Sequence, residues 1–251
     1  MDKRLHLKNI ADDGFTIIGN VFSEYEVKTI LNQISKADTG NTTFRKTDDL
    51  FAIRQFLKEV PEVKTLILNK ALKGLIETLF SDDYFLVKSI YFDKPEKSNW
   101  FVAYHQDLTI SVDKLANLPG YGPWTVKQNQ FAVQPPLEIL EQNFTIRIHL
   151  DDTDQTNGAL RVVPGSHSKG IYRPETIDWS KEHEATCDVP KGGIMIMRPL
   201  LLHASSRSTG NNRRRVVHVE FSKFNLPNTL DWAEKIITFE SCVSPSSAQV
   251  T

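Results

Sequence analysis

Hydrophobic and polar positions in the first third of the chain follow the spacing of amphipathic helices. Ser23, followed three residues later by Glu26, has the pattern of a capping box, which commonly marks the first turn of a helix. The apolar residues after it recur at intervals of three and four, at Val27, Ile30, Leu31 and Ile34. A second helix is expected to begin near Pro61, because proline suits a first turn, and to extend to about Leu79. The pattern predicts a helical N-terminal part over about residues 1–82.

From about residue 84 the pattern changes to short apolar or alternating runs separated by Gly, Pro, Asn and Asp. The runs that predict strands are Tyr84–Phe92, Trp100–Val112, Phe144–Leu150, Ala159–Val163, Gly193–Met197 and Arg214–Phe221. Because no long helix separates them, they predict a β-sandwich or barrel core over about residues 84–222. The segment 113–143 is long for a connection and is expected to be an ordered lid or binding loop.

Composition and charge narrow the class of protein. The chain has 251 residues, and 30 basic against 31 acidic side chains give a formal net charge of −1. Such a charge gives no electrostatic reason to expect binding to nucleic acid or to an anionic membrane. Only two cysteines occur, the start lacks the apolar core of a signal peptide, and no apolar run approaches the roughly 20 residues that span a bilayer. We expect one cytoplasmic domain over residues 1–240, with residues 241–251 as a flexible tail.

Two His-x-Asp pairs are candidates for metal binding. Residues i and i+2 of a strand point to the same face, so each pair would place an imidazole beside a carboxylate. These are two of the three ligands of a facial triad, which a second histidine would complete. The pairs are His105-Gln106-Asp107 and His149-Leu150-Asp151. Strand alternation would put Phe101 and Ala103 on the face of the first pair. The alternation alone does not choose between the pairs, and a strand histidine hydrogen-bonded to a neighbour is the simpler interpretation of either.

The C-terminal strands contain a further histidine and an arginine. His203 follows a buried-type apolar run, and Arg214 comes eleven residues later. Strand alternation places Arg214, Val216, His218 and Glu220 on one face, and Arg213 and Arg215 on the other, towards solvent. An inward arginine suits a dicarboxylate ligand, because its planar fork binds a carboxylate through two hydrogen bonds. A basic strand without any ligand remains the alternative.

The segment Asp151–His167 resembles the signature of the phytanoyl-CoA dioxygenase family. The resemblance rests on its Asn-Gly and Pro-Gly-Ser-His elements, on the upstream His-Gln-Asp at 105–107, and on His203 and Arg214 downstream. It extends over about residues 84–222. It implies an Fe(II)- and 2-oxoglutarate-dependent dioxygenase built on a double-stranded β-helix, a cupin-like jelly-roll barrel with N-terminal helices packed on it.

The resemblance also implies roles for individual residues. His105, Asp107 and His203 would bind the iron. Arg214 would bind the distal carboxylate of 2-oxoglutarate, and the hydroxyl of Ser205 would support the same carboxylate. The second pair, His149-Leu150-Asp151, would then lie on a following strand without binding metal, and His167 would be structural.

Two residues that differ from those of particular family members bear on the substrate and on the reaction. Arg147 stands where the phytanoyl-CoA enzyme has a tryptophan, which makes it a candidate contact for 2-oxoglutarate or substrate and weakens the case for phytanoyl-CoA itself. Halogenating relatives have a small residue where Asp107 stands, so the carboxylate favours hydroxylation by O2, with release of succinate and CO2. The expected substrate is a small molecule. The rival hypothesis is a barrel that binds a metal or ligand without oxygenase turnover.

Overall fold

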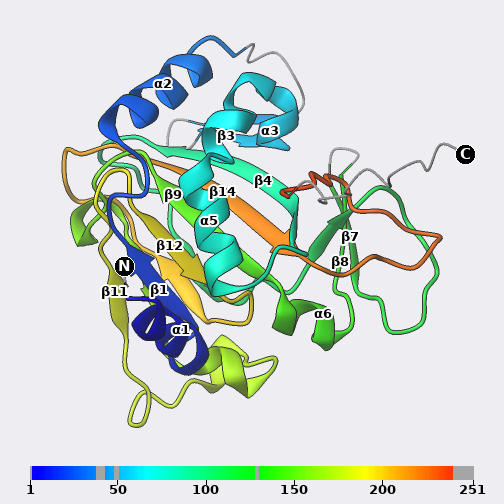
Figure 1. Ribbon diagram of the computed structural model, residues 1–251. Helices are drawn as coiled ribbons and strands as arrows, with labels where there is room; N and C mark the ends of the chain where they lie inside the picture. Colours follow the sequence, from blue (N-terminus) through cyan, green and yellow to red (C-terminus); the bar gives the residue numbers. More distant parts are fainter. Residues whose placement is uncertain (1, 38–42, 48–50, 128–129, 240–251) are drawn as a thin grey trace, which may run out of the picture.

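The structure is a computed structural model and describes residues 2–37, 43–47, 51–127 and 130–239 of the chain. The expected tail at 241–251 lies outside the described residues. Three antiparallel sheets form most of the molecule (Figure 1). No helix among the described residues is long and apolar enough to cross a membrane.

The largest sheet has seven strands and forms the centre of the molecule. In spatial order they are β1 (Phe15–Ile18), β12 (Ile194–Met197), β9 (Phe144–His149), β14 (Arg214–Ser222), β4 (Phe85–Lys94), β3 (Phe51–Arg54) and β2 (Phe44–Lys46). β14 and β4 make the longest pairing, with Arg214 opposite Lys94 at one end and Ser222 opposite Phe85 at the other.

A four-stranded sheet packs against this large sheet. Its order is β11 (Ala185–Cys187), β10 (Leu160–Val162), β13 (His203–Ser205) and β5 (Val102–His105). Leu160 and Val162 of β10 share a buried apolar cluster with Met195 and Met197 of β12, so side chains of both sheets fill the space between them. This pair of packed antiparallel sheets is the predicted double-stranded β-helix.

The segment 113–143, expected to be an ordered lid or binding loop, contributes two strands to a third, smaller sheet. β6 (Ile110–Val112), β8 (Gln130–Val133) and β7 (Trp124–Lys127) pair in this order, and the short helix α6 (Leu137–Gln142) follows. The expected strand Trp100–Val112 is therefore two strands, β5 and β6, which belong to different sheets.

Alternating residues divide the two faces of the large sheet. Ile146 and Ile148 of β9 and Val217 of β14 belong to the largest apolar cluster, together with buried residues of the N-terminal helices. Helix α5 (Lys70–Leu79) crosses this face of the sheet in front of β9 and β14 (Figure 1). The residues between them, Arg147 and His218, instead line a pocket shared with the smaller sheet. The helices therefore close one face, and the other face is available for a polar site.

The N-terminal part contains more than the expected helices. Helix α1 (Lys3–Asp12) precedes β1, and helix α3 (Phe56–Glu59) follows β3. The description of residues 1–82 as helical is thus wrong for β1, β2 and β3, which extend both edges of the large sheet. Pairing with strands distant in sequence stabilises these short segments, and local propensity does not report such pairing.

The expected helix from Pro61 to Leu79 is also interrupted. It consists of a 3₁₀ turn at Pro61–Val63, α4 (Lys64–Ile67) and α5. Asn69 separates the last two: its backbone is extended, and its side-chain oxygen accepts a hydrogen bond from Leu72 N at 2.9 Å. Asparagine competes for backbone donors in this way and favours a new helix start over continuation.

Helix α2 (Glu24–Ile34) begins with the predicted capping box. Ser23 Oγ accepts from Glu26 N at 3.3 Å, and Glu26 Oε2 accepts from Ser23 N at 2.8 Å. Ser23→Ala should lower the free energy of unfolding by about 1 kcal/mol, because Glu26 N loses its acceptor and Glu26 Oε2 loses the hydroxyl that donates to it. Urea unfolding measures this, with Lys28→Ala on the exposed side of the same helix as a control within about 0.5 kcal/mol of wild type. Equal losses in both variants would contradict a capping role.

Candidate metal centre

The pairing of β5 with β13 brings the predicted metal ligands together. His105 at the end of β5 lies directly opposite His203 at the start of β13, and their ring centroids are 4.3 Å apart. Asp107 follows β5, and its backbone N–H donates to Pro199 O at 2.8 Å, which anchors the residue next to β13. One ligand atom from each of the three side chains lies within 4.8 Å of the others.

The three side chains are arranged as ligands and not as a hydrogen-bonded cluster. Asp107 Oδ1 lies 3.9 Å from His105 Nε2, and Asp107 Oδ2 lies 3.8 Å from His203 Nε2. These distances exceed a hydrogen bond, and the buried Oδ2 has no hydrogen-bond partner. The Nδ1 atoms of His105 and His203 each lie 2.9 Å from a backbone carbonyl, that of Ala103 and Leu201 respectively. Donation from Nδ1 leaves each Nε2 lone pair free for a cation.

The charges also suit a metal ion. Burial alone would raise the pKa of Asp107, but the nearby His203, His218 and Lys88 outweigh it and hold this pKa at about 2. Burial lowers the pKa of His203 to about 4. At neutral pH the carboxylate is therefore ionised and His203 is neutral, which are the forms that bind metal. Two imidazoles and one carboxylate are the donor set of non-haem Fe(II) oxygenases.

Arg214 and Ser205 meet at the other end of the same pocket. The Arg214 guanidinium is 2% exposed; its Nη1 donates to Gly158 O and lies 3.3 Å from Ser205 Oγ. Ser205 Oγ in turn donates to Gly158 O at 3.0 Å. Burial, with a smaller effect of Arg147, lowers the pKa of Arg214 to about 9, so the side chain stays charged at neutral pH. Its buried Nε has no hydrogen-bond partner and is available to an anionic ligand.

Arg147 belongs to a buried chain of hydrogen bonds beside the metal ligands. Arg147 Nη1 donates to His218 Nδ1 at 3.2 Å, and His218 Nε2 donates to Glu220 Oε1 at 2.9 Å. Lys88 Nζ donates to the same Glu220 oxygen at 2.7 Å. Burial lowers the pKa of Arg147 to about 10 and also lowers the pKa of His218. The chain thus holds a charged guanidinium and a neutral imidazole against the pocket.

All six residues singled out from the sequence line one pocket of about 220 Å³. They are His105, Asp107, His203, Arg147, Arg214 and Ser205. Apolar walls between the two sheets complete it, including Phe92, Trp100 and Leu160. One pocket is therefore lined by a carboxylate, imidazole groups and two arginines, which suits a metal ion together with an anionic ligand.

The second His-x-Asp pair is engaged elsewhere. His149 Nδ1 lies 2.7 Å from Thr153 Oγ1, whereas Asp151 forms a two-point ion pair with Arg215, with N–O distances of 2.8 and 2.6 Å. His167 Nε2 lies 3.2 Å from Ala11 O, which ties its turn to helix α1. The outward placement of Arg213 also agrees with strand alternation, since it pairs with Asp93.

The prediction from strand alternation that Phe101 and Ala103 share a face with His105 is wrong. His105 shares the pocket with Val102, which lies three positions away, while Phe101 and Ala103 are exposed. The pairing of β5 with β13 shifts register between His203 and Ser205, and such an irregularity changes which side chains point inward. A bulge of this kind depends on the partner strand and has no signal within β5 itself.

Lys88 is a site residue that the sequence analysis misses. It lies on β4 at alternating spacing with Ile90 and Phe92, and all three line the pocket. This alternation is the signal that could have indicated an inward lysine. Burial alone would lower the pKa of Lys88, but the nearby Glu220 carboxylate outweighs burial and raises it. Glu220 thus neutralises the charge of Lys88. Glu220 also forms a possible second ligand group with Asp107 and His218, but its carboxylate is already paired with Lys88 and His218.

Comparisons with known proteins agree with this fold. The sequence model for phytanoyl-CoA dioxygenase matches residues 10–216. No curated protein matches the chain significantly in sequence. The solved structure of SnoK, a non-heme alpha ketoglutarate dependent carbocyclase from nogalamycin biosynthesis, shares 17% identity and has a TM-score of 0.64, with 87% of this chain and 83% of that chain covered.

Two further solved structures have similar folds. EctD from S. alaskensis, with bound Fe, shares 16% identity at a TM-score of 0.67, covering 88% of this chain and 76% of that chain. HygX from Streptomyces hygroscopicus, with nickel, 2-oxoglutarate and hygromycin B bound, shares 17% identity at a TM-score of 0.61, covering 87% and 86%. At these identities the likeness concerns the fold, and it confirms the predicted double-stranded β-helix.

Proposed function

The chain belongs to the phytanoyl-CoA dioxygenase family, whose members are Fe(II)- and 2-oxoglutarate-dependent oxygenases, and on this premise we propose that it hydroxylates a small molecule. In this proposal His105, Asp107 and His203 hold the iron. The observation that carries it is the buried Asp107 Oδ2, which has no hydrogen-bond partner and lies 3.8 Å from His203 Nε2, in a carboxylate whose other oxygen is 3.9 Å from His105 Nε2. A buried carboxylate oxygen without a donor is costly unless a cation neutralises it.

Arg214 and Ser205 would bind the distal carboxylate of 2-oxoglutarate. Both residues line the pocket and lie together, with Arg214 Nη1 3.3 Å from Ser205 Oγ, and Arg214 Nε has no hydrogen-bond partner. Burial strengthens a charge-assisted hydrogen bond to such a guanidinium. Arg147 would contribute a second positive charge, held in place by His218. When bound, the iron would activate O2 as the oxidant, and 2-oxoglutarate would be oxidised to succinate and CO2, so that one oxygen atom goes to succinate and the other to the substrate.

In this proposal the remaining residues of the pocket wall limit the access of water to the pocket and orient the substrate. Phe92 stacks near Trp100, with ring centroids 6.4 Å apart, and both close the pocket with apolar surface. Lys88 and Glu220 neutralise each other, so they keep polar atoms in the wall without leaving an unpaired charge. A dry wall of this kind protects a reactive site from side reactions with water.

Release of succinate tests the proposal against a barrel that only binds a metal or ligand. The purified protein with Fe(II), 2-oxoglutarate, ascorbate and a panel of small metabolites should form succinate, and a true substrate should stimulate it. Binding of both Fe(II) and 2-oxoglutarate without succinate formation under any condition would favour the non-oxygenase alternative.

Hydroxylation should be the outcome even in chloride-rich buffer. Asp107 occupies the coordination position that a halide would need, so the oxygen of O2 should be transferred to the substrate. Mass analysis of products formed under labelled O2 measures this once a substrate is found. SnoK, a carbocyclase with a similar fold, shows why this needs testing, since carbocycle formation differs from hydroxylation. A chlorinated main product, or a product without label under conditions that limit exchange, would contradict the proposal.

A further inference from the structure

Arg147 is a buried cation in the pocket around the proposed metal ligands, which we call the iron pocket. It lies on β9 between Met195 of β12 and His218 of β14, and its side chain lines the pocket. The residue is 7% exposed, and its Nε has no hydrogen-bond partner. Within the part of the chain that the structure describes, no carboxylate forms an ion pair with it. A buried charge is costly unless an opposite charge pairs with it.

The hydrogen-bond partner of Arg147 orients the guanidinium without neutralising it. His218 Nε2 donates to Glu220 Oε1, so the other ring nitrogen, Nδ1, accepts from Arg147 Nη1 at 3.2 Å. An imidazole with one N–H is neutral. His218 therefore engages one nitrogen of the guanidinium and leaves Nε and Nη2 for a different partner.

Two other arginines of the same protein show what these free atoms can bind. Arg213 donates from Nε and Nη2 to the two carboxylate oxygens of Asp93. Arg215 donates from Nε and Nη2 to the carboxylate of Asp151. Because Nε–H and Nη2–H point the same way, this edge of a guanidinium matches a carboxylate. Arg147 offers the same edge to the pocket without a carboxylate on it.

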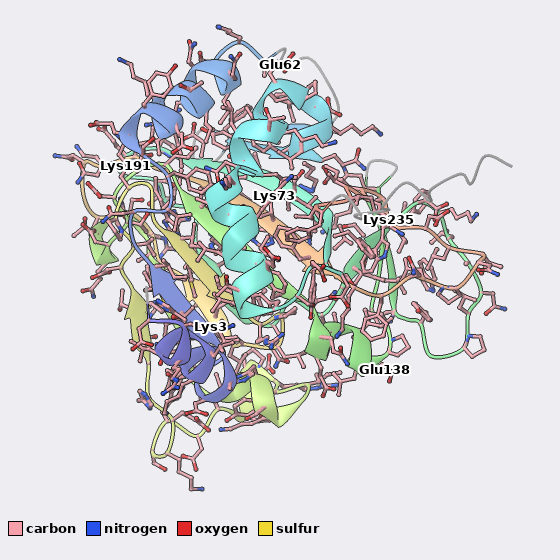
Figure 2. The ribbon with its side chains drawn as sticks, viewed as in Figure 1. Lys3, Glu62, Lys73, Glu138, Lys191 and Lys235 are labelled. Carbon is pink, nitrogen blue, oxygen red and sulfur yellow. The ribbon has the colours of Figure 1, made fainter. Side chains whose placement is uncertain are left out.

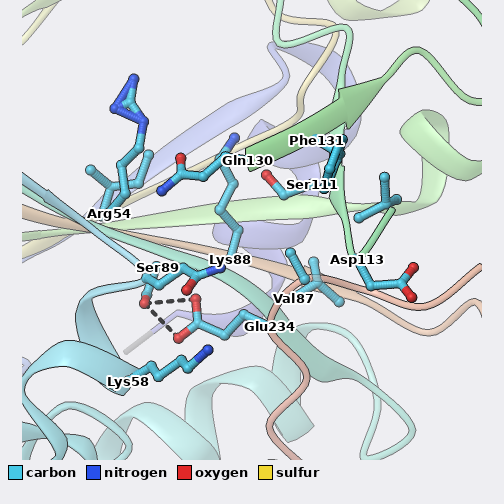
Figure 3. Close-up of a pocket in the computed structure, with 14 residues that line it drawn as sticks. Arg54, Lys58, Val87, Lys88, Ser89, Ser111, Asp113, Gln130, Phe131 and Glu234 are labelled. Atoms are coloured by element: carbon cyan, nitrogen blue, oxygen red, sulfur yellow. Dashed lines mark hydrogen bonds between the residues drawn. The ribbon is translucent and has the colours of Figure 1, made fainter. Parts of the chain in front are cut away.

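The other cations of the iron pocket have partners of their own. Lys88 Nζ donates to Glu220 at 2.7 Å, and Figure 3 shows its side chain extending past Gln130 along the wall of a neighbouring cavity. Arg214 is the proposed partner of the distal carboxylate of 2-oxoglutarate, and the metal would hold the near carboxylate. Both ends of the co-substrate are thus engaged without Arg147.

The charge balance of the loaded pocket indicates the charge of the missing partner. The charges of Fe(II) and of 2-oxoglutarate cancel, and histidines bind a metal in their neutral form. Among the lining residues, Asp107 offsets one arginine, and Glu220 offsets Lys88. One positive charge remains, and Arg147 is the cation without an anion. A single negative charge suits a carboxylate better than a phosphate ester, which carries about −1.5 to −2 at neutral pH.

We propose that the substrate is an organic acid whose carboxylate binds the Nε and Nη2 edge of Arg147 inside the iron pocket. The pocket volume of about 220 Å³ is below the range of about 300–1,000 Å³ common for ligand sites, so the part of the acid next to the metal is compact. The inference rests on the proposed oxygenase function for the reaction. The free charge of Arg147 does not depend on that function and can be tested separately.

Chemical labelling of a cysteine measures the charge of the pocket without a known substrate. Val102→Cys, in the pocket wall, is made in a Cys242→Ser background, in which the remaining Cys187 is 1% exposed. Reaction rates of the metal-free protein are compared for a negatively charged sulfonatoethyl and a positively charged trimethylammonioethyl methanethiosulfonate. Relative to free 2-mercaptoethanol, the anionic reagent should be favoured by about 10-fold or more, because a charge in a cleft concentrates counter-ions. Phe92→Cys, also in the wall, replaces Val102→Cys if the latter does not fold.

Matched variants assign this preference to its source. Arg147→Gln should lower it by about 3-fold or more, whereas Arg147→Lys keeps the charge and should keep most of it. Arg147→Met is the second uncharged variant if the glutamine variant does not fold. Lys73→Gln is the control, because Lys73 lies on α5, which crosses the opposite face of the large sheet (Figure 2). A missing preference, one that survives the uncharged variants, or an equal decrease in Lys73→Gln would overturn the free charge of Arg147.

Binding of 2-oxoglutarate distinguishes a substrate contact from a co-substrate contact. In calorimetric titration with Mn(II) present, Arg147→Gln should bind 2-oxoglutarate within about 5-fold of wild type, less than the roughly 10-fold that one charge-assisted hydrogen bond contributes. A loss as large as that of Arg214→Ala would make Arg147 a co-substrate contact and overturn the inference. Absence of 2-oxoglutarate binding in the wild-type protein would instead contradict the oxygenase function, and the labelling result would stand.

The reaction itself tests the substrate class. Carboxylic acids are compared with their uncharged amides and with phosphate esters for stimulation of succinate release. Arg147→Gln should raise the KM of an active acid by about 10- to 150-fold with a smaller change in kcat. Stimulation only by uncharged compounds, or only by phosphate esters, would overturn the proposal.

Discussion

Replacing His203 or His105 by alanine should remove tight Fe(II) binding and all turnover while the fold persists. In the proposed site each histidine would supply one of three ligand atoms that lie within 4.8 Å of one another, and two ligands do not hold iron in an open facial site. Neither imidazole is part of an apolar cluster, so its loss should change the melting temperature little. Calorimetric titration with Fe(II) under anaerobic conditions measures binding, and thermal unfolding checks the fold.

His149→Ala is the matched control for this prediction. His149 belongs to the other His-x-Asp pair and contacts Thr153 instead of a possible ligand. Burial and the neighbouring Arg147 and Arg214 lower its pKa, so it is neutral like His203. It should not bind metal because, among the described residues, it belongs to neither group of side chains that could hold an ion. Loss of iron binding in His149→Ala with retention in His105→Ala would show that the wrong pair has been chosen.

Much of the β-sheet core follows from local sequence patterns. β4, β9, β10, β12 and β14 lie within or close to the predicted ranges, because their apolar residues alternate or form short runs bounded by turn residues. The N-terminal strands β1, β2 and β3 could not be recognised in the same way. They have three or four residues each, and they are strands because β1 pairs with β12, β3 with β4, and β2 with β3.

Some residues of the candidate site could likewise be predicted from the sequence, and others could not. His105, Asp107, His203 and Arg214 were found from their types and from a family resemblance, and they meet in one pocket. Lys88 was not found, because its role depends on Glu220, which is 132 positions away in the sequence. A second cavity of about 290 Å³, which shares Lys88 and Ile90 with this pocket, could not be predicted either, since its walls come from five segments that only the tertiary structure brings together.

Three consecutive arginines allow the predicted co-substrate site to be tested within one strand. Arg214 lines the pocket of the candidate metal centre. Arg213 pairs with Asp93, and Arg215 pairs with Asp151, on the other face of β14. Arg214→Ala should weaken 2-oxoglutarate binding about 10- to 150-fold, because a charge-assisted hydrogen bond contributes about 1.5–3 kcal/mol. Calorimetric titration with 2-oxoglutarate in the presence of Mn(II) measures the affinity.

Arg214→Lys distinguishes loss of charge from loss of geometry. It retains a positive charge but not the planar fork that binds a carboxylate at two points, so its affinity should fall between those of wild type and Arg214→Ala. Arg213→Ala and Arg215→Ala should bind 2-oxoglutarate within about 2-fold of wild type, because their side chains neutralise carboxylates outside the pocket. These two substitutions should instead lower the free energy of unfolding slightly. The loss should be larger at position 215, because the Arg215 side chain is 24% exposed and the Arg213 side chain is 54% exposed. Equal losses of affinity at all three positions would mean that the effect is one of overall charge, and the assignment of Arg214 as the carboxylate partner would be wrong.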